Sequence, residues 1–599
     1  MSGRVLKLVA PVVALALALA GCGDDDGNGG ATALENDFPP PTEAPADAAR
    51  GGELTVLSSG DVDFIDPGAS YFQYTYMVTN AMHRTLLAWR PGDTEQPSPD
   101  LAHSEPEISE DGRTVTFTIR EGVEFGPPVS REVASADVKY AIERGLLPGV
   151  ANGYLQTYAA DLVGFEAAVA AAERDPTEAP DIAGIETPDE RTLRFELDRP
   201  TGAVLVQSLS LPISAPVPEE YAAEFDAEEP STYGAHVVAS GPYTIPADPD
   251  GELTGYAPGR ELRLVRNPNW DPDTDWRPAY LDEITIQPGF ADAGSAARKV
   301  LAGAAQVNGD FSPPPTVLRE AASERPEQLT LTPSGGNRYV TLNITIPPFD
   351  DLDVRRAVVA GMDREALRAT RGGELLGPVA THFIPPEIPG FDQAGGAEGP
   401  ELDFLADPAG DDELASEYMR AAGHESGRYE GDESVVLVGE SVAPGRETAR
   451  IVADELEELG FDAELRLVSP DALLTRFCTV PGAEIAVCPN GGWLKDFNDP
   501  QSILDPTFSG DSIRKSNNAN WSELDDPEVD RAMDEAALIA DPEERAEAWG
   551  EVDAMVTELA PAVPWIWDLQ ANVRSEDVAG VINKFTAGWD LSFTSLAGG

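Results

Sequence analysis

Histidine and cysteine are rare in this 599-residue sequence, with five and three residues, and the common catalytic and metal-binding motifs are absent. G-x-S-x-G, H-E-x-x-H, G-x-x-x-x-G-K-[ST] and G-x-G-x-x-G are all absent, which removes the usual signs of a hydrolase, a zinc enzyme or a nucleotide-binding protein. The five histidines are scattered: His83, His103, His236, His382 and His424. With 106 Asp and Glu residues, paired carboxylates occur by chance at every spacing that a glycosidase would need. We therefore expect no catalytic residues, no metal site and no cofactor.

The N-terminal segment has the features of a bacterial signal peptide. Arg4 and Lys7 are followed by an apolar run at 8–20, which is shorter than the roughly 20 residues that cross a bilayer as a helix. Leu19-Ala20-Gly21-Cys22 resembles the lipobox of bacterial lipoproteins, in which the cysteine is lipidated and becomes the first residue of the mature chain. The alternative is an ordinary secreted protein with a cysteine there by chance. We expect a lipid on Cys22 that anchors the protein to the outside of the cell membrane.

The other two cysteines, Cys478 and Cys488, stand close together in the sequence. In an extracytoplasmic chain an even number of nearby cysteines favours a local disulfide, and two free buried thiols are the alternative. No histidine stands at metal-ligand spacing from either cysteine, so a zinc site is not indicated.

The composition argues against nucleic-acid binding and supports a folded, multidomain chain. The formal net charge is −65, so the surface would repel the phosphates of nucleic acids. Hydrophobic residues make up 42% of the sequence, which is enough for a sizeable core. The length predicts more than one domain.

Strands and helices alternate along the chain, which predicts a mixed α/β protein. Alternation of apolar and polar residues predicts strands at 52–57, 114–120, 192–197, 262–265, 284–287 and 338–346. A strand, an amphipathic helix ended by Gly460 and a second strand follow one another within 435–468, which predicts a parallel β-α-β unit. Asp541 and Pro542 predict the start of a helix whose apolar stripe includes Trp549 and Val556.

Eight motifs in order resemble the extracytoplasmic solute-binding proteins of ABC transporters, in the oligopeptide, dipeptide and nickel-binding family. They are GGELT at 51–55, PDLA at 99–102, DGRTVTFTIREGVEF at 111–125, ADVKY at 136–140, SGPY at 240–243, RNPNW at 266–270, PFDDLDVRRA at 348–357 and GWLKDFNDP at 492–500. The resemblance covers essentially residues 50–595. The resemblance supports the same expectations as the signal peptide and the absent catalytic motifs, namely a secreted protein that is not an enzyme.

The resemblance implies a periplasmic-binding-protein-like fold with two lobes that close about a hinge, mixed sheets and an extra family-specific domain. After the signal peptide and a flexible tether, lobe I would be discontinuous, with the extra domain II between its first two segments and lobe III between its last two. The expected ranges are 1–21 for the signal peptide, 22–49 for the tether, 50–93, 219–333 and 566–599 for lobe I, 94–218 for domain II and 334–565 for lobe III.

The resemblance also implies a ligand site in the motif at 492–500. In peptide binders of this family the residue at the position of Asp496 pairs with the α-ammonium of the ligand, and an aromatic residue at the position of Trp493 lines the pocket. An ammonium group that leaves water needs an ionised acceptor, and a tryptophan offers apolar area and a cation-attracting face. The alternatives are a surface carboxylate for Asp496 and core packing for Trp493.

Tyr71 and Tyr74 belong to an aromatic cluster where the cleft wall of the family begins, and they either contact ligand or pack in the core. Asn490 stands where some peptide binders carry an arginine for the peptide C-terminus, and Lys495 beside Asp496 is also unusual for the family. These two departures leave open the length of the ligand and whether it is a peptide.

We therefore expect a monomeric, membrane-anchored binding protein of an ABC importer that captures peptides or peptide-like solutes and delivers them to the membrane subunits of a permease. One alternative is the same fold with a non-peptide solute such as a metal chelate or an oligosaccharide. The other is a secreted lipoprotein hydrolase, for which no nucleophile is evident.

Overall fold

This computed structural model describes residues 37–150, 152–515 and 518–597, which lie within one compact unit, Ala31–Gly599. The predicted signal peptide, the lipobox with Cys22 and the first part of the predicted tether fall outside the described residues.

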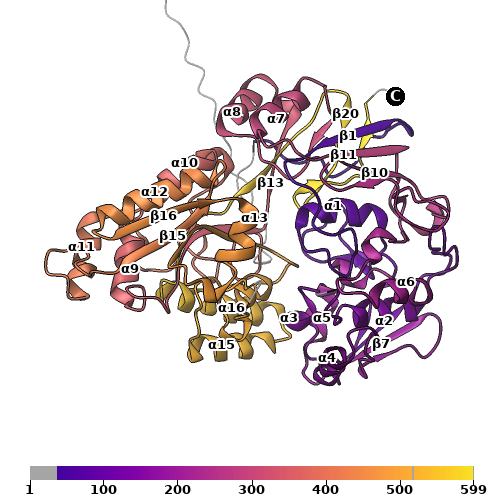
Figure 1. The fold of residues 1–599 in the computed structure, drawn as a ribbon, viewed down its shortest axis with the longest axis horizontal. Coiled ribbons are helices and arrows are strands. Elements are labelled where there is room, and N and C mark those ends of the chain that lie inside the picture. Colours follow the sequence, from indigo (N-terminus) through magenta and orange to yellow (C-terminus); the bar gives the residue numbers. More distant parts are fainter. Residues whose placement is uncertain (1–36, 151, 516–517, 598–599) are drawn as a thin grey trace, which may run out of the picture. The chain divides into compact units, whose positions relative to one another are not determined.

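The first sheet joins strands from two distant stretches of the chain (Figure 1). Its order is β12-β1-β11-β10-β8, and β9 pairs with β10. β1 is parallel to β11 and β12, whereas β10 is antiparallel to β11, so this sheet is mixed. Leu54 and Val56 of β1 are fully buried, as alternation in a strand requires. The strands are β1 Glu53–Leu57, β8 Tyr243–Thr244, β9 Tyr256–Ala257, β10 Glu261–Arg266, β11 Glu283–Gln287 and β12 Val307–Asn308.

The second sheet has the order β16-β15-β17-β14-β18. Strands β15 and β16 are parallel, and α12 connects them and lies beside them in Figure 1, which confirms the predicted β-α-β unit. Strand β14 lies between β17 and β18 and is antiparallel to both. The elements are β14 Gly336–Leu342, β15 Ser434–Glu440, α12 Gly445–Glu458, β16 Asp462–Val468, β17 Val487–Leu494 and β18 Ala562–Ile566.

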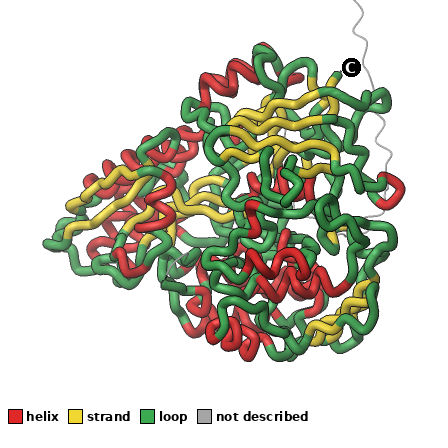
Figure 2. The backbone as a smooth tube through the Cα atoms, turned by 45° about the vertical axis from the view of Figure 1, so that its right-hand side comes forward, coloured by secondary structure: helices red, strands yellow, loops and turns green. Residues whose placement is uncertain are grey.

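A third, antiparallel sheet has the order β4-β5-β7-β6. Figure 2 shows the strands of the sheets as separate yellow groups with red helices packed around them. Phe117 of β5 and Phe195 of β7 meet edge to face in the core, with ring centroids 6.0 Å apart. The strands are β4 Glu107–Ile108, β5 Thr114–Thr118, β6 Ile185–Glu186 and β7 Thr192–Glu196.

Helices cover these sheets and fill the space between them. Helix α16 begins as predicted, because the Asp541 carboxylate accepts hydrogen bonds from the backbone N–H groups of Glu543 and Glu544. The other helices are α1 Gln73–Met82, α2 Ser135–Arg144, α3 Leu155–Tyr158, α4 Phe165–Arg174, α5 Gly202–Ser208, α6 Glu219–Asp226, α7 Ala293–Leu301, α8 Pro315–Glu324, α9 Leu352–Gly361, α10 Arg364–Arg371, α11 Asp412–Ala421, α13 Pro470–Ala472, α14 Gln501–Phe508 and α15 Pro527–Ala537, and α16 itself spans Pro542–Glu558.

One predicted strand is wrong at its end. The alternation over 338–346 predicts a single strand, but β14 stops at Leu342. The side chain of Asn343 accepts hydrogen bonds from the backbone N–H and the hydroxyl of Thr345, at 3.0 and 2.7 Å. The backbone N–H of Ile346 then donates to the Asn343 carbonyl at 3.2 Å. This side-chain-stabilised turn competes with strand pairing and ends the ladder.

Two short strands link the first and second sheets. Strand β13 Leu329–Pro333 precedes β14, strand β19 Leu569–Val573 follows β18, and the two pair antiparallel. The backbone N–H of Val573 donates to the side chain of Asn308 in β12, at 2.8 Å, so the pair also contacts the first sheet. Figure 1 shows β13 between the two sheets. The lobe boundaries expected near 333 and 566 would fall at the ends of this pair, and they remain a prediction.

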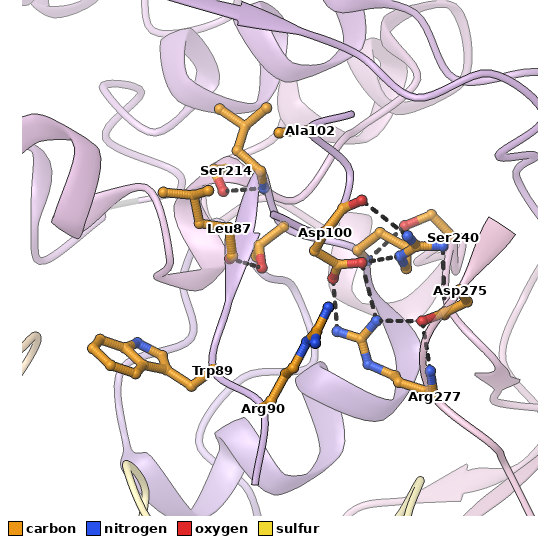
Figure 3. Close-up of polar contacts among 12 residues, drawn as sticks. Leu87, Trp89, Arg90, Asp100, Ala102, Ser214, Ser240, Asp275 and Arg277 are labelled. Carbon is orange, nitrogen blue, oxygen red and sulfur yellow. Dashed lines mark hydrogen bonds and ion pairs between the residues drawn. The ribbon is translucent and has the colours of Figure 1, made fainter. Parts of the chain in front are cut away.

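The PDLA motif at 99–102 has a structural role, shown in Figure 3. Asp100 is fully buried and forms an ion pair with Arg84 and a 2.6 Å ion pair with Arg277. Asp275 pairs with the same arginine at 3.0 Å. This buried network joins three separate segments of the chain.

Candidate functional site

A cavity of about 400 Å³ is lined by all four residues that are predicted from the sequence to contact ligand. Its wall is built from the start of α1, the end of β17 and the segments before β14 and after β18. The predicted contacts on this wall are Tyr71, Tyr74, Trp493 and Asp496. The volume lies in the lower part of the range typical of small-molecule sites.

Asp496 follows the end of β17 and is 9% exposed. The hydroxyl of Tyr158, in the short helix α3, donates a hydrogen bond to its Oδ2 atom. Within the part of the chain that the structure describes, no lysine or arginine pairs with this carboxylate. Burial raises the pKa of Asp496 to about 7, although the hydrogen bond from Tyr158 lowers it. A buried carboxylate that lines a cavity and has no cationic partner is suited to bind a positively charged group.

Aromatic rings surround this carboxylate. Tyr71 stacks on Tyr154 with ring centroids 4.8 Å apart and meets Trp493 edge-on at 6.4 Å. The ring of Tyr158 packs edge to face against Phe497 at 4.8 Å. Such faces attract cations and provide apolar contact area, so the site combines a fixed anion with a cation-attracting wall.

The position of Tyr71 and Tyr74 is set by the start of α1. The Asp63 side chain accepts hydrogen bonds from the backbone N–H groups of Tyr71 and Phe72, at 2.7 and 2.9 Å, before the helix begins at Gln73. Burial raises the pKa of both tyrosine hydroxyls above the usual value, so both stay neutral and can donate hydrogen bonds to a ligand.

Trp493 is partly packed in the core and partly on the cavity wall. Its indole Nε1 donates to the Ser502 carbonyl at 2.9 Å, and the ring packs against a hydrophobic cluster under the second sheet. The remaining part of the half-buried ring lines the cavity. The strand therefore holds Trp493 in a fixed orientation beside Asp496.

Lys495, the unusual neighbour of Asp496, does not pair with it. Its ammonium group lies 5.0 Å from the centre of the Phe585 ring, and burial lowers its pKa to about 8. Its backbone carbonyl accepts a hydrogen bond from the side chain of Gln73 at 3.3 Å. Lys495 therefore connects the end of β17 to α1 and to the C-terminal segment.

Cys478 and Cys488 form a disulfide in the structure, and neither lines the cavity. Across the described ranges, no group of three or more His, Cys, Asp or Glu side chains has the geometry of a metal site.

Four residues of the site were not identified from the sequence: Tyr154, Tyr158, Arg338 and Asp568. Tyr158 is separated from Asp496 by 338 positions, and no local pattern signals such a contact. Arg338 did leave a signal, because it shares the strand alternation of Val340 and Leu342 and so is a charged residue on an apolar face.

Comparisons with known proteins agree with this fold. A family model described as bacterial extracellular solute-binding proteins, family 5 Middle, matches residues 96–515. Di/tripeptide-binding protein 3 of Pseudomonas aeruginosa (strain UCBPP-PA14) is 24% identical over 524 residues, which are 85% of this chain and 89% of that protein. The solved structure of clavulanic acid biosynthesis oligopeptide binding protein 2 is similar with a TM-score of 0.77 and 26% identity, over 93% of this chain and 99% of that one. The periplasmic binding protein DppA from Helicobacter pylori in complex with peptide STSA has a TM-score of 0.74 and 18% identity, over 92% and 98% of the two chains.

The chain belongs to family 5 of the bacterial extracellular solute-binding proteins, because that model matches more than half of its length. The mixed α/β fold of periplasmic binding proteins, expected from the sequence, is confirmed. Members of this family bind solutes for ABC transporters outside the cytoplasm and are not enzymes, so the prediction of a non-catalytic protein is also confirmed. No helix in the described ranges has both the length and the apolar character of a membrane span.

Proposed function

We propose that this protein captures short peptides or peptide-like solutes in the cavity around Asp496 and delivers them to the permease of an ABC importer. The observation that carries the proposal is the buried Asp496 carboxylate, which lies among Tyr71, Tyr158 and Trp493 and has no cationic partner among the described residues. The α-ammonium of a peptide supplies the missing charge. The name of the Pseudomonas relative supports the choice of short peptides.

Ligand binding would favour a closed arrangement of the two lobes. The cavity wall includes Tyr74 from the N-terminal segment, Trp493 from β17 and Trp589 near the C-terminus, so one ligand would contact both expected lobes. The β13 and β19 pair, where the chain passes between the first and second sheets, is the expected hinge.

A lipid anchor at Cys22 and an oxidised Cys478–Cys488 pair belong to the same proposal. The lipobox resemblance supports the anchor, and the extracytoplasmic location of the family supports oxidation. Metabolic labelling with a radioactive fatty acid, with and without Cys22→Ser, tests the anchor. An unlabelled wild-type protein would contradict it.

Isothermal titration tests the ligand class. The wild-type protein is titrated with mixed-sequence pools of di- to tetrapeptides, with the same pools N-acetylated, and with an oligosaccharide mixture. We expect heat from the free peptides only, and a loss of at least about tenfold in affinity for Asp496→Asn. Unchanged binding of the acetylated pool, or of the free pool to the variant, would remove the ammonium-binding role of Asp496. Binding of the oligosaccharides alone would replace the peptide by another solute.

A further inference from the structure

We propose that Lys495 is a latch between the two expected lobes: its ammonium group binds the Phe585 ring, and this contact holds the lobes together and keeps Asp496 in position. The inference rests on the proposed function, because a latch affects binding only if the lobes close around a ligand. Lys495 does not line the cavity, so it would act as a positioning residue that the ligand does not touch. The path of the side chain, the place of its ammonium group and the support of the ring carry the inference.

The Lys495 side chain runs across the point where the chain passes from β13 to β14. Its backbone N–H donates to the Gly335 carbonyl at 3.0 Å. Gly335 lies between the two strands with a positive φ of 64°. A Cβ atom on this glycine would lie 2.5 Å from Lys495 Cδ and 2.9 Å from its Nζ atom. The lysine stem therefore fills the space above Gly335, at the expected hinge.

The ammonium group of Lys495 lies in the interior of the protein rather than in solvent. Only 3% of the residue is exposed, and its Nζ atom lies 5.0 Å from the centre of the Phe585 ring. Among the described residues no carboxylate forms an ion pair with this group. Burial lowers the pKa of Lys495 to about 8 and Glu387 acts in the opposite direction, so the group is charged at pH 7. A desolvated cation gains more from an aromatic face than an exposed one does.

The Phe585 ring is held in a fixed position in the C-terminal segment. It stacks on Trp89 with ring centroids 4.0 Å apart and planes 1° from parallel. The Asn583 side chain accepts a hydrogen bond from the Phe585 backbone N–H at 3.1 Å and donates to the Trp89 carbonyl at 2.8 Å. Both aromatic residues fall in ranges expected for lobe I, whereas Lys495 falls in the range expected for lobe III. The contact therefore joins the two expected lobes.

The latch also fixes the proposed ligand-binding carboxylate, because Asp496 directly follows Lys495 in the chain. Gln73 supports the same position by donating to the Lys495 carbonyl at 3.3 Å. Opening of the lobes would have to separate the ammonium group from the ring. We therefore expect the latch to slow the release of ligand more than it changes its capture, because the contact stabilises the closed arrangement.

Stopped-flow measurement of binding rates tests the latch. Tryptophan fluorescence follows capture and release of the mixed-sequence pool of free-ended di- to tetrapeptides. Lys495→Met keeps an apolar stem but removes the charge, so it should raise the release rate at least about fivefold and change the capture rate less than about twofold. Lys495→Arg should recover part of the loss, because it keeps a cation that packs on aromatic rings.

A double-mutant cycle tests whether Lys495 acts through the ring. Phe585→Leu removes the aromatic face and should raise the release rate at least as much as Lys495→Met does. Adding Lys495→Met to Phe585→Leu should then change the release rate less than about twofold, because the interaction is already lost. Effects that multiply in the double variant would overturn the latch.

Lys299→Met is the matched control. The Lys299 ammonium group lies 4.6 Å from the centre of the Phe290 ring, and both residues fall in one range expected for lobe I. This variant removes the same charge and the same kind of contact within one lobe, and should keep the release rate within about twofold of the wild type. An equal rise in both methionine variants would overturn the latch. Thermal unfolding followed by circular dichroism checks that Lys495→Met folds, and if it does not, Phe585→Leu and Lys495→Arg decide the question.

The outcomes separate the latch from the proposed function. If peptides bind the wild type and leave Lys495→Met at an unchanged rate, the latch is overturned and peptide binding through Asp496 stands. If no peptide pool binds the wild type, the proposed function fails, and small-angle X-ray scattering without peptide decides the latch. Lys495→Met should then have a larger radius of gyration than the wild type and Lys299→Met should not. Equal radii for all three proteins would overturn the latch.

Discussion

At the scale of single residues, the proposed ligand binding depends on one buried carboxylate, Asp496. Aromatic side chains lie around Asp496, and its carboxylate accepts a hydrogen bond from Tyr158. In the described ranges no lysine or arginine pairs with it. Its pKa near 7 means that the carboxylate is partly protonated at neutral pH. A bound ammonium group would stabilise the ionised form and lower that pKa.

Peptide binding should therefore depend on pH. Below pH 7 the ligand must displace a proton from Asp496, so affinity should fall by about tenfold per pH unit as the pH decreases. Above about pH 8 the peptide amino group loses its own proton, and affinity should fall again. Titration calorimetry between pH 5.5 and 8.5 measures this profile. Asp496→Asn should lack the acidic limb, and a wild-type affinity equal at pH 5.5 and 7.5 would contradict the assignment.

The same burial should make the ligand-free protein less stable at high pH. Because the folded-state pKa of Asp496 is raised, the protonated form is the one favoured by folding. The free energy of unfolding is therefore highest below about pH 4, where this carboxyl is protonated in both states, and it falls as the pH rises through 7. Asp496→Asn should raise the free energy of unfolding at pH 8 by about 1–4 kcal/mol and change it little at pH 4. Urea unfolding at both pH values measures this, and a destabilised variant at pH 8 would contradict it.

The sequence indicated some residues of the site and not others for a physical reason. Asp496 and Trp493 lie in one continuous motif, so both were accessible from the sequence. Tyr158 and Arg338 reach the cavity through tertiary contacts between distant segments. Such contacts depend on how sheets and helices pack, and local periodicity does not contain that information.

At the scale of elements, local sequence patterns predict strands and helix starts correctly where a single interaction determines the structure. The β-α-β unit of β15, α12 and β16 and the Asp541 cap of α16 are of this kind. The end of β14 was not predictable from apolar alternation, because Ile344 and Ile346 continue the pattern while the Asn343 side chain stabilises a turn.

Breaking the buried ion-pair network around Asp100 should strongly destabilise the fold. Asp100→Asn removes the buried carboxylate that pairs with both Arg84 and Arg277, and leaves Asp275 to pair with them. We expect a loss of about 3–5 kcal/mol in the free energy of unfolding, measured by urea denaturation. Glu464→Gln, in an exposed ion pair with Arg466 on β16, is the control and should change stability by less than about 1 kcal/mol. Equal stabilities of the two variants would show that the network does not hold these segments together.

At the scale of the whole molecule, the proposed function depends on movement of the two expected lobes. The cavity is lined from both expected lobes, and the β13 and β19 pair lies where the chain crosses between the sheets. A ligand that contacts both sides stabilises the closed arrangement by its difference in affinity for the closed and open states.

Closure should be visible in solution. Small-angle X-ray scattering should show a smaller radius of gyration when the free-ended peptide pool is added. The decrease should be absent for the N-acetylated pool and for Asp496→Asn. A radius that does not change with a pool that calorimetry shows to bind would mean that the cavity works without hinge closure.

The most direct measurement is a crystal structure of the protein with a bound short peptide. We expect the α-ammonium nitrogen to lie within about 3.2 Å of an Asp496 carboxylate oxygen, among Tyr71, Tyr158 and Trp493. A peptide whose amino group points to solvent, or one bound outside this cavity, would contradict peptide binding through Asp496.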